Sequence, residues 1–185
     1  MYYLFLADGF EETEAIAPLD ILRRAEIPVK TVAVGENPVC GAHGISICAD
    51  LTLDQLDPAS CEGMILPGGM PGTLNLQKCP QVIALMEILN QKNGLIAAIC
   101  AAPMIPGSMG LLDGKNAVCF PGFEDQMEHA NILDANVAAD GNFITARGAG
   151  AAMEFGAAIV DYYFNKPGKG DRLLSQMQFH YERKN

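Results

Sequence analysis

Residues 95–103 read LIAAICAAP, and this stretch decides the fold class. Its first five residues are all apolar, which is typical of a strand covered on both faces of a sheet. Cys100 stands at the end of that strand, and Pro103 can begin a helix. The pattern predicts a sharp strand-to-helix turn that presents one nucleophilic side chain, as in a nucleophile elbow.

The same alternation of apolar strands and amphipathic helices continues on both sides of this stretch. We expect further strands over residues 2–7, 29–34, 45–49 and 63–66, a strand from Val118 to the Pro121-Gly122 turn, and a hairpin of 137–139 with 143–146. Helices are expected over residues 11–24, 80–90 and 150–164, with Pro18 kinking or interrupting the first. This succession predicts a doubly wound α/β fold, in which a mostly parallel sheet lies between helical layers and sites form at the carboxyl ends of strands.

Length and composition limit the classes of function. A chain of 185 residues with 50% hydrophobic content is expected to form one domain, residues 1–185, with a large core. Its net charge of -10 disfavours nucleic acid as a partner. The apolar run before Asp8 is too short for a signal segment or a membrane span, so a cytoplasmic protein without a membrane partner is expected.

The six cysteines are spaced without a C-x-x-C pair, so no metal site is expected, and no phosphate-binding loop points to a cofactor. Cys100 differs from the other five in its strand-to-helix setting. There, free N–H groups of the new helix would favour the thiolate, although an inert buried cysteine is the open alternative. Cys40, Cys48, Cys61, Cys79 and Cys119 are interpreted as packing residues, with Cys61 and Cys79 exposed enough to oxidise incidentally.

Two further features can lie near Cys100 if the strands are neighbours. The Pro67-Gly68-Gly69 loop ends an adjacent strand, so its N–H groups, together with that of Ala101, can form an oxyanion hole. Glu14 follows the first strand at helical spacing and can reach the sulfur, provided that it is buried and protonated. Glu11 and Glu12 are interpreted as solvent-facing acids of the first helical turn, and Glu14 itself can equally be one.

The three histidines, His43, His129 and His180, are not placed beside Cys100 by this interpretation. His43 and His129 are expected on the surface or in loops, and His180 in the basic stretch from residue 165 to the end. That stretch is interpreted as a solvated helix end. A Cys–His pair is therefore not predicted.

Four motifs occur in the order and spacing of a known family: LADGFEETEA (6–15), LPGGMPG (66–72), AAICAAP (97–103) and TARGAG (145–150). On these motifs the chain resembles the ThiJ/PfpI superfamily, in the branch that contains YajL and the parkinsonism-associated protein deglycase. The resemblance covers nearly the whole chain. It implies a flavodoxin-like α/β sandwich of the class I glutamine amidotransferase type.

For the site, the resemblance implies that Cys100 is an oxidation-sensitive nucleophile and Glu14 its hydrogen-bonding acid, with Gly69 and Ala101 as backbone oxyanion donors. It also implies a homodimer in which the first helix, around Arg24, lies near the partner's site.

The sequence departs from the family at two places. Phe120 stands where a family member carries a histidine near the cysteine, which puts a His-assisted hydrolytic step in doubt. Ala42-His43-Gly44 replaces Ser-Arg-Gly, so a histidine that is mostly neutral at pH 7 takes the place of an arginine.

These residues support three hypotheses. The first is a glyoxalase- or deglycase-like hydrolase in which Cys100 attacks small reactive aldehydes, such as methylglyoxal, or glycated side chains, and which serves an oxidative-stress response. The second is a non-catalytic redox sensor or chaperone that uses oxidation of Cys100. The third is a PfpI-type cysteine peptidase or amidase, which would pair the cysteine with a histidine.

Overall fold

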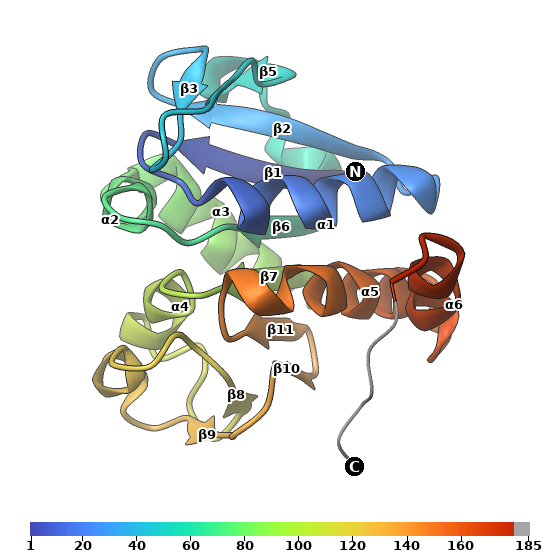
Figure 1. Cartoon of the computed structure of the whole chain (residues 1–185). Coiled ribbons are helices and arrows are strands. Elements are labelled where there is room, and N and C mark those ends of the chain that lie inside the picture. The colour runs from blue at the N-terminus through green and yellow to red at the C-terminus, as the bar shows by residue number, and fades with distance from the viewer. Residues whose placement is uncertain (180–185) are drawn as a thin grey trace.

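The computed structural model describes residues 1–179, and a central sheet with helices on both faces organises them (Figure 1). The sheet runs in the order β10-β11-β7-β6-β1-β2-β5. Its strands are β1 (Tyr2–Ala7), β2 (Val29–Val34), β5 (Leu51–Thr52), β6 (Gly63–Leu66), β7 (Leu95–Ile99), β10 (Val137–Asp140) and β11 (Phe143–Ala146). All its pairs are parallel except the β10–β11 hairpin. The predicted mixed α/β fold with a largely parallel sheet is confirmed.

The remaining elements lie around this sheet. Two short ladders pair β3 (Val39–Cys40) with β4 (Ser46–Ile47) and β8 (Asn116–Ala117) with β9 (Asn131–Ile132). The α-helices are α1 (Glu12–Arg24), α2 (Gly72–Gln77), α3 (Pro80–Gln91), α4 (Met104–Ser108), α5 (Ala152–Tyr163) and α6 (Lys169–Gln176). Single 3₁₀ turns occupy Leu53–Gln55, Pro58–Ser60, Glu124–Met127 and Ala149–Ala151. None of the helices among residues 1–179 is both long enough and apolar enough to cross a membrane.

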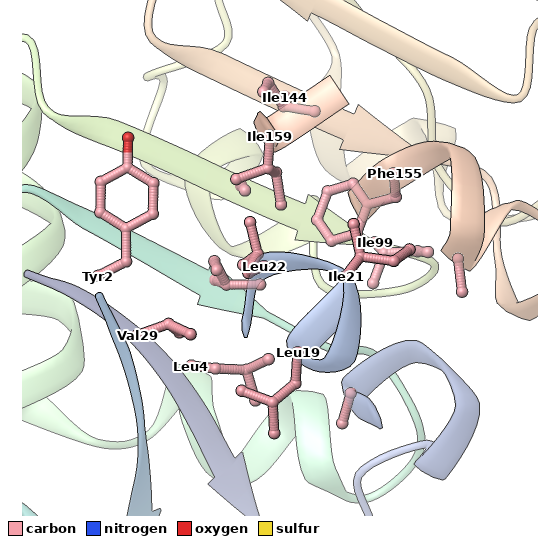
Figure 2. Packing of buried hydrophobic residues seen from close by; sticks show 14 of the residues in the cluster. Tyr2, Leu4, Leu19, Ile21, Leu22, Val29, Ile99, Ile144, Phe155 and Ile159 are labelled. Atoms are coloured by element: carbon pink, nitrogen blue, oxygen red, sulfur yellow. The ribbon is translucent and has the colours of Figure 1, made fainter. Parts of the chain in front are cut away.

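Side-chain alternation along the strands divides the core into two layers. In β1, Leu4 and Leu6 join the layer that α1 and α5 cover, whereas Tyr3 and Phe5 join the layer beneath α2, α3 and α4. Figure 2 shows the first of these layers, where apolar side chains of the sheet meet those of the two helices. Because both faces are covered, the interior strands are apolar throughout, as their sequences indicated.

Pro18 does not interrupt the first helix, although an interruption was one of the two outcomes expected from the sequence. Helix α1 runs from Glu12 to Arg24 without an interruption, with Pro18 buried inside it. Close packing against α5 accounts for this, because a Cβ atom added at Gly156 would lie 3.1 Å from the Cα of Pro18. Contact between the two helices thus maintains the helix through a residue that removes one of its hydrogen bonds.

Of two predicted strands, one is absent and one is shortened, because side chains or the backbone of a turn take the place of ladder partners. Residues 118–121 form no strand: Val118 N–H donates to Thr145 Oγ1 (2.9 Å) and Phe120 N–H donates to the carbonyl of Cys100 (2.9 Å). Of residues 45–49, only Ser46–Ile47 is a strand, and Ala49 N–H donates to Asn37 Oδ1 (2.9 Å). In both segments the backbone groups are satisfied without a sheet partner.

The parallel strands bring several chain turns to one edge of the sheet. In the register of β6 with β7, Leu66 lies beside Ala98, so the loop that begins at Pro67 lies next to Cys100. Strand β1 is the other neighbour of β6, and it leads into α1. The carboxyl edge of the sheet therefore gathers the candidate residues from β1–α1, β6 and β7.

Candidate functional site

Cys100 adopts a left-handed backbone conformation, which residues other than glycine rarely adopt. It follows β7 with φ of +65°, in the left-handed region, and its side chain is half-buried. Its N–H donates to the carbonyl of Ala146 (2.9 Å), and its carbonyl accepts from Phe120 N–H (2.9 Å). These two contacts come from different parts of the chain and hold the turn in place.

Glu14 reaches the sulfur from helix α1. It is 1% exposed, its side chain hydrogen-bonds Cys100, and its Oε2 accepts a hydrogen bond from Gly68 N–H (2.9 Å). Burial raises the pKa of Glu14 to about 7, and the negative charge of Glu11 acts in the same direction. The carboxyl group therefore gains and loses its proton near neutral pH, and its ionised form accepts a hydrogen bond from the Cys100 thiol, which lowers the pKa of Glu14 and raises that of Cys100.

Gly68 is the residue that lets these two side chains meet. A Cβ atom at this position would lie 2.7 Å from the Cβ of Cys100 and 2.7 Å from Glu14 Oε2. Such contacts are shorter than van der Waals distance, so any side chain here would displace one of the two groups. Gly68 is a site residue that the sequence analysis did not single out, although the Gly-Gly pair was the available signal.

The backbone N–H groups of Gly69 and Ala101 hydrogen-bond the sulfur from two sides. Gly69 has φ of +90°, and a Cβ atom there would lie 2.5 Å from the backbone nitrogen of Glu11. The loop can pack against the turn between β1 and α1 only without a side chain at this position. The structure thus brings Cys100, Glu14, Gly69 and Ala101 together, as the sequence predicted them to lie.

The pKa of Cys100 shifts in the direction opposite to the one expected from the sequence. Burial, followed by the charge and hydrogen bond of Glu14, raises the pKa of the thiol to about 12, although the amides of Ala101 and Gly69 favour the thiolate. Helix α4 is only five residues long and begins at Met104, after a turn, so it supplies little dipole stabilisation. The sulfur therefore becomes a strong nucleophile only as its proton leaves for another group.

Glu12 is buried rather than solvent-facing, so that interpretation was wrong. It is 7% exposed and binds the loop at His43, whose N–H donates to Oε1 (2.7 Å) and whose Nδ1 lies 2.7 Å from Oε2. These hydrogen bonds outweigh burial and lower the pKa of Glu12, while Glu12 raises the pKa of His43 above its ordinary value. His43 therefore carries a positive charge over a wider pH range than the sequence indicated.

The metal-ligating atoms of Glu11, Glu12 and His43 lie within 4.8 Å of one another, the one such group among residues 1–179. The contacts to His43 occupy both oxygens of Glu12, and Glu11 Oε2 accepts from Glu14 N–H (2.7 Å). We assign this group to anchoring the loop and capping α1.

No histidine among residues 1–179 hydrogen-bonds Cys100. His43 is bound to Glu12, His129 is an exposed loop residue, and His180 lies outside the described residues. Phe120, which stands in place of the family histidine, is 47% exposed and lies against Gly148. The Cys–His pair of a PfpI-type peptidase is therefore not formed by these residues.

The other cysteines differ from the expectation in exposure. Cys61 is fully buried and Cys79 is 9% exposed, whereas Cys40 and Cys48 are exposed. Burial raises the pKa of Cys61 and of Cys119 to about 11. Incidental oxidation is thus expected at Cys40 and Cys48, because accessibility decides it when the thiols are otherwise alike.

Comparisons with known proteins agree with the motifs. The profile of the DJ-1/PfpI family matches residues 2–162. The chain is 37% identical to the Parkinson disease protein 7 homolog of Danio rerio over 163 residues, which cover 85% of this chain and 86% of that protein. It is 32% identical to the deglycase PH1704 of Pyrococcus horikoshii, covering 80% and 90% of the two chains.

Among solved structures, the oxidised DJ-1 of Toxoplasma gondii superposes with a TM-score of 0.89. The two sequences are 28% identical, and the superposition covers 97% of this chain and 98% of the other. Both the sequence profile and the fold thus point to one family.

Proposed function

Because the chain belongs to the DJ-1/PfpI family, we propose that it is a cysteine-dependent hydrolase that removes reactive carbonyls as part of an oxidative-stress response. The observation that carries the proposal is the contact between Cys100 and a buried Glu14 whose pKa is about 7, with two backbone amides on the sulfur. The name of the Pyrococcus horikoshii relative, a deglycase, supports the same substrate class.

The proposed reaction uses Glu14 as a proton carrier. In its ionised form Glu14 takes the thiol proton while the sulfur of Cys100 forms a bond to the aldehyde carbon of methylglyoxal. The negative charge that develops on oxygen is stabilised by the N–H groups of Gly69 and Ala101 until Glu14 returns the proton. This gives a hemithioacetal, and no group outside the site is required for the step.

A second proton transfer converts the hemithioacetal into a form that water can hydrolyse. Glu14 removes the hydrogen from the former aldehyde carbon, a proton returns to the neighbouring carbon, and the hemithioacetal becomes a thioester of a hydroxy acid. Water cleaves the thioester, which releases lactate and restores the thiol of Cys100. The sum is methylglyoxal plus water giving lactate, and an adduct on an amine or thiol would release that group as well.

The test compares two variants, each of which replaces one cysteine by serine. Cys100→Ser is expected to abolish lactate formation from methylglyoxal, and Cys40→Ser, which changes an exposed cysteine, is expected to leave it unchanged. Circular dichroism and urea unfolding check that both variants keep the fold. Turnover by Cys100→Ser at the wild-type rate would disprove the proposal.

A redox-sensing function, with signalling or chaperone activity as its output, is the alternative. The similar Toxoplasma gondii structure is of an oxidised protein, and the protonated carboxyl of Glu14 can donate a hydrogen bond to a sulfinate on Cys100. Under mild peroxide, intact-mass and peptide analysis should find two added oxygens on Cys100 before any other thiol. Random oxidation across the cysteines, with Cys40 and Cys48 first, would exclude this function.

We also propose a homodimer formed through helix α1. Ile16 of α1 is 40% exposed and lines a cleft of about 320 Å³ together with Leu19, Ile47 and Cys48, and with the charged residues Asp20, Arg23 and Asp50. Ile45, just before β4, is 58% exposed. Apolar side chains exposed around one cleft are typical of a protein–protein contact. Arg24 lies at the end of the same helix, where the family resemblance places the partner subunit.

A further inference from the structure

A second cleft is lined by residues at or just after the ends of β8, β9 and β11, three strands that are labelled in Figure 1. Its volume is about 240 Å³, enough for a molecule the size of an amino acid. Cys119 lines it as a buried residue, and Ile132 and Leu133 line it as apolar side chains exposed by 41% and 40%. We call it the Arg147 cleft.

The Arg147 cleft adjoins the candidate active site through residues that follow its lining residues in the sequence. Cys119 lines the cleft, and the next residue, Phe120, donates its N–H to the carbonyl of Cys100 (2.9 Å). Arg147 also lines the cleft, and the next residue, Gly148, lies against the Phe120 ring and near Glu14, with 3.9 Å from a Cβ atom placed there to Oε1. Two residues that line the cleft, Cys119 and Arg147, are thus each one position from a residue that contacts the candidate site.

The cleft carries charges of both signs. Arg147 is 45% exposed, and its Nη1 contacts Asp134 Oδ1 (2.9 Å), a carboxylate that is itself 96% exposed. Such a pair is weak, because water competes for both groups, so a ligand carboxylate can take the place of Asp134. Glu124 lines the cleft as well, and its charge raises the pKa of Cys119, after burial as the larger cause. The Glu124 carboxylate is thus close to the thiol that lines the cleft.

We propose that the Arg147 cleft binds the zwitterionic head of an amino acid, whose carboxylate contacts Arg147 and whose ammonium contacts Glu124. Ile132 and Leu133 cover the carbons between the head and the side chain. In a lysine that carries a carbonyl adduct, the modified side chain would then extend past Phe120 toward Cys100. This rests on the proposed function and narrows its substrates to adducts on free amino acids, in preference to adducts on polypeptides.

A zwitterion matches the charges of the Arg147 cleft better than a simple anion or a simple cation does. A simple anion would be repelled by Glu124 and Asp134, and a simple cation would be repelled by Arg147. A zwitterion meets a charge of opposite sign at each end, and charge-assisted hydrogen bonds to a guanidinium favour a carboxylate, which is planar like its partner. The apolar walls add a contact that neither inorganic ion would use.

The test measures binding without turnover, on the Cys100→Ala variant. Nε-acetyl-L-lysine is titrated and followed by amide NMR shifts, which should change at Leu133 and Arg147. Its Nα-acetyl amide, which lacks both head charges, should bind at least about tenfold more weakly because two charge-assisted hydrogen bonds are lost. Equal binding of the two compounds, or shifts confined to other parts of the protein, would overturn the proposal.

Matched charge variants identify the two contacts. Arg147→Gln and Glu124→Gln should each weaken Nε-acetyl-L-lysine binding by about tenfold, whereas Arg172→Gln, which removes an arginine on α6, should not change it. Urea unfolding checks that each variant is folded. Unchanged affinity in both cleft variants would refute the proposed contacts.

A separate assay distinguishes failure of this inference from failure of the proposed function. The wild type is tested for lactate formation from methylglyoxal, a substrate that has no amino-acid head. Turnover of methylglyoxal without binding of Nε-acetyl-L-lysine would refute the cleft assignment and leave the hydrolase standing. Binding of Nε-acetyl-L-lysine without turnover of methylglyoxal would refute the hydrolase and leave the cleft assignment standing.

Discussion

Replacing Glu14 by glutamine should change how the stability of the protein depends on pH. Glu14 is 1% exposed, and burial raises its pKa from the ordinary 4.5 to about 7. Glutamine has nearly the same shape and can still accept the hydrogen bond from Gly68 N–H, but it has no proton to lose in this range. The variant thus removes one titration with little change in packing.

The sign and size of the effect follow from the two pKa values. Between pH 4.5 and 7 the folded protein keeps a proton on Glu14 that the unfolded chain has lost, so the free energy of unfolding falls as pH rises through this range. The full loss above pH 7 is roughly 3 kcal/mol, since each pKa unit corresponds to about 1.4 kcal/mol. From pH 5 to pH 8 the wild type should lose roughly 2 to 3 kcal/mol more than Glu14→Gln.

Urea unfolding at pH 5 and pH 8, at one protein concentration, measures this difference. His43 also has a raised pKa and contributes with the same sign, but it is present in both proteins and cancels in the comparison. Glu12 and Asp50 have lowered pKa values, so their contributions are lost only at more acidic pH. If wild type and Glu14→Gln lost equal stability between the two pH values, Glu14 would not titrate near neutrality and could not act as the proposed proton carrier.

Further variants test the turn at Cys100, the close approach of Gly68 to the two site side chains, and the proposed dimer. Gly68→Ala should lower both activity and stability because its Cβ would lie 2.7 Å from each of the two site side chains. Gly148→Ala should be tolerated better, because the tightest contact of its Cβ is 3.2 Å to the Phe120 ring and Glu14 Oε1 lies 3.9 Å away; equal urea-unfolding losses would contradict this ranking. Cys100→Gly should be more stable than Cys100→Ala by about 1 kcal/mol, because φ of +65° costs energy only where a Cβ is present. If urea unfolding found Cys100→Ala to be more stable than Cys100→Gly, the turn at Cys100 would not be strained. Ile16→Glu should convert the proposed dimer to a monomer in sedimentation experiments, and Ile88→Glu, which is 45% exposed on α3, should not; a dimer that survives Ile16→Glu would place the contact elsewhere.

The residues that hold the sulfur of Cys100 differ from the residues that line the Arg147 cleft. The sulfur, its acid and the two amides are fixed by backbone contacts of three different loops, whereas the Arg147 cleft is built from residues after β8, β9 and β11. Substitutions in the cleft can therefore alter which molecules reach the sulfur without disturbing the sulfur's own contacts.

The amino-acid sequence alone predicted the buried parallel strands and placed Cys100, Glu14, Gly69 and Ala101 at one edge of the sheet, whereas the strand predicted at 118–121 is absent. Buried parallel strands are continuous apolar runs, so Leu95–Ile99 was recognisable, and small residues mark the turn at Cys100 and the loop at Gly69. Glu14 was identifiable as a candidate because a carboxylate one turn into a helix after a strand lies at the same sheet edge. All of these are local patterns, which the order of residues records directly.

Only the tertiary structure decided the charge state of the site and the partners of its polar groups. Glu14 meets Gly68 across 54 positions of sequence, and Glu12 is bound to His43 across 31, which no local pattern indicates. The pKa of Cys100 is raised rather than lowered because burial and a neighbouring carboxyl outweigh two amides. Removal of water from a charged group depends on everything that packs around it, and that is set by contacts between distant parts of the chain.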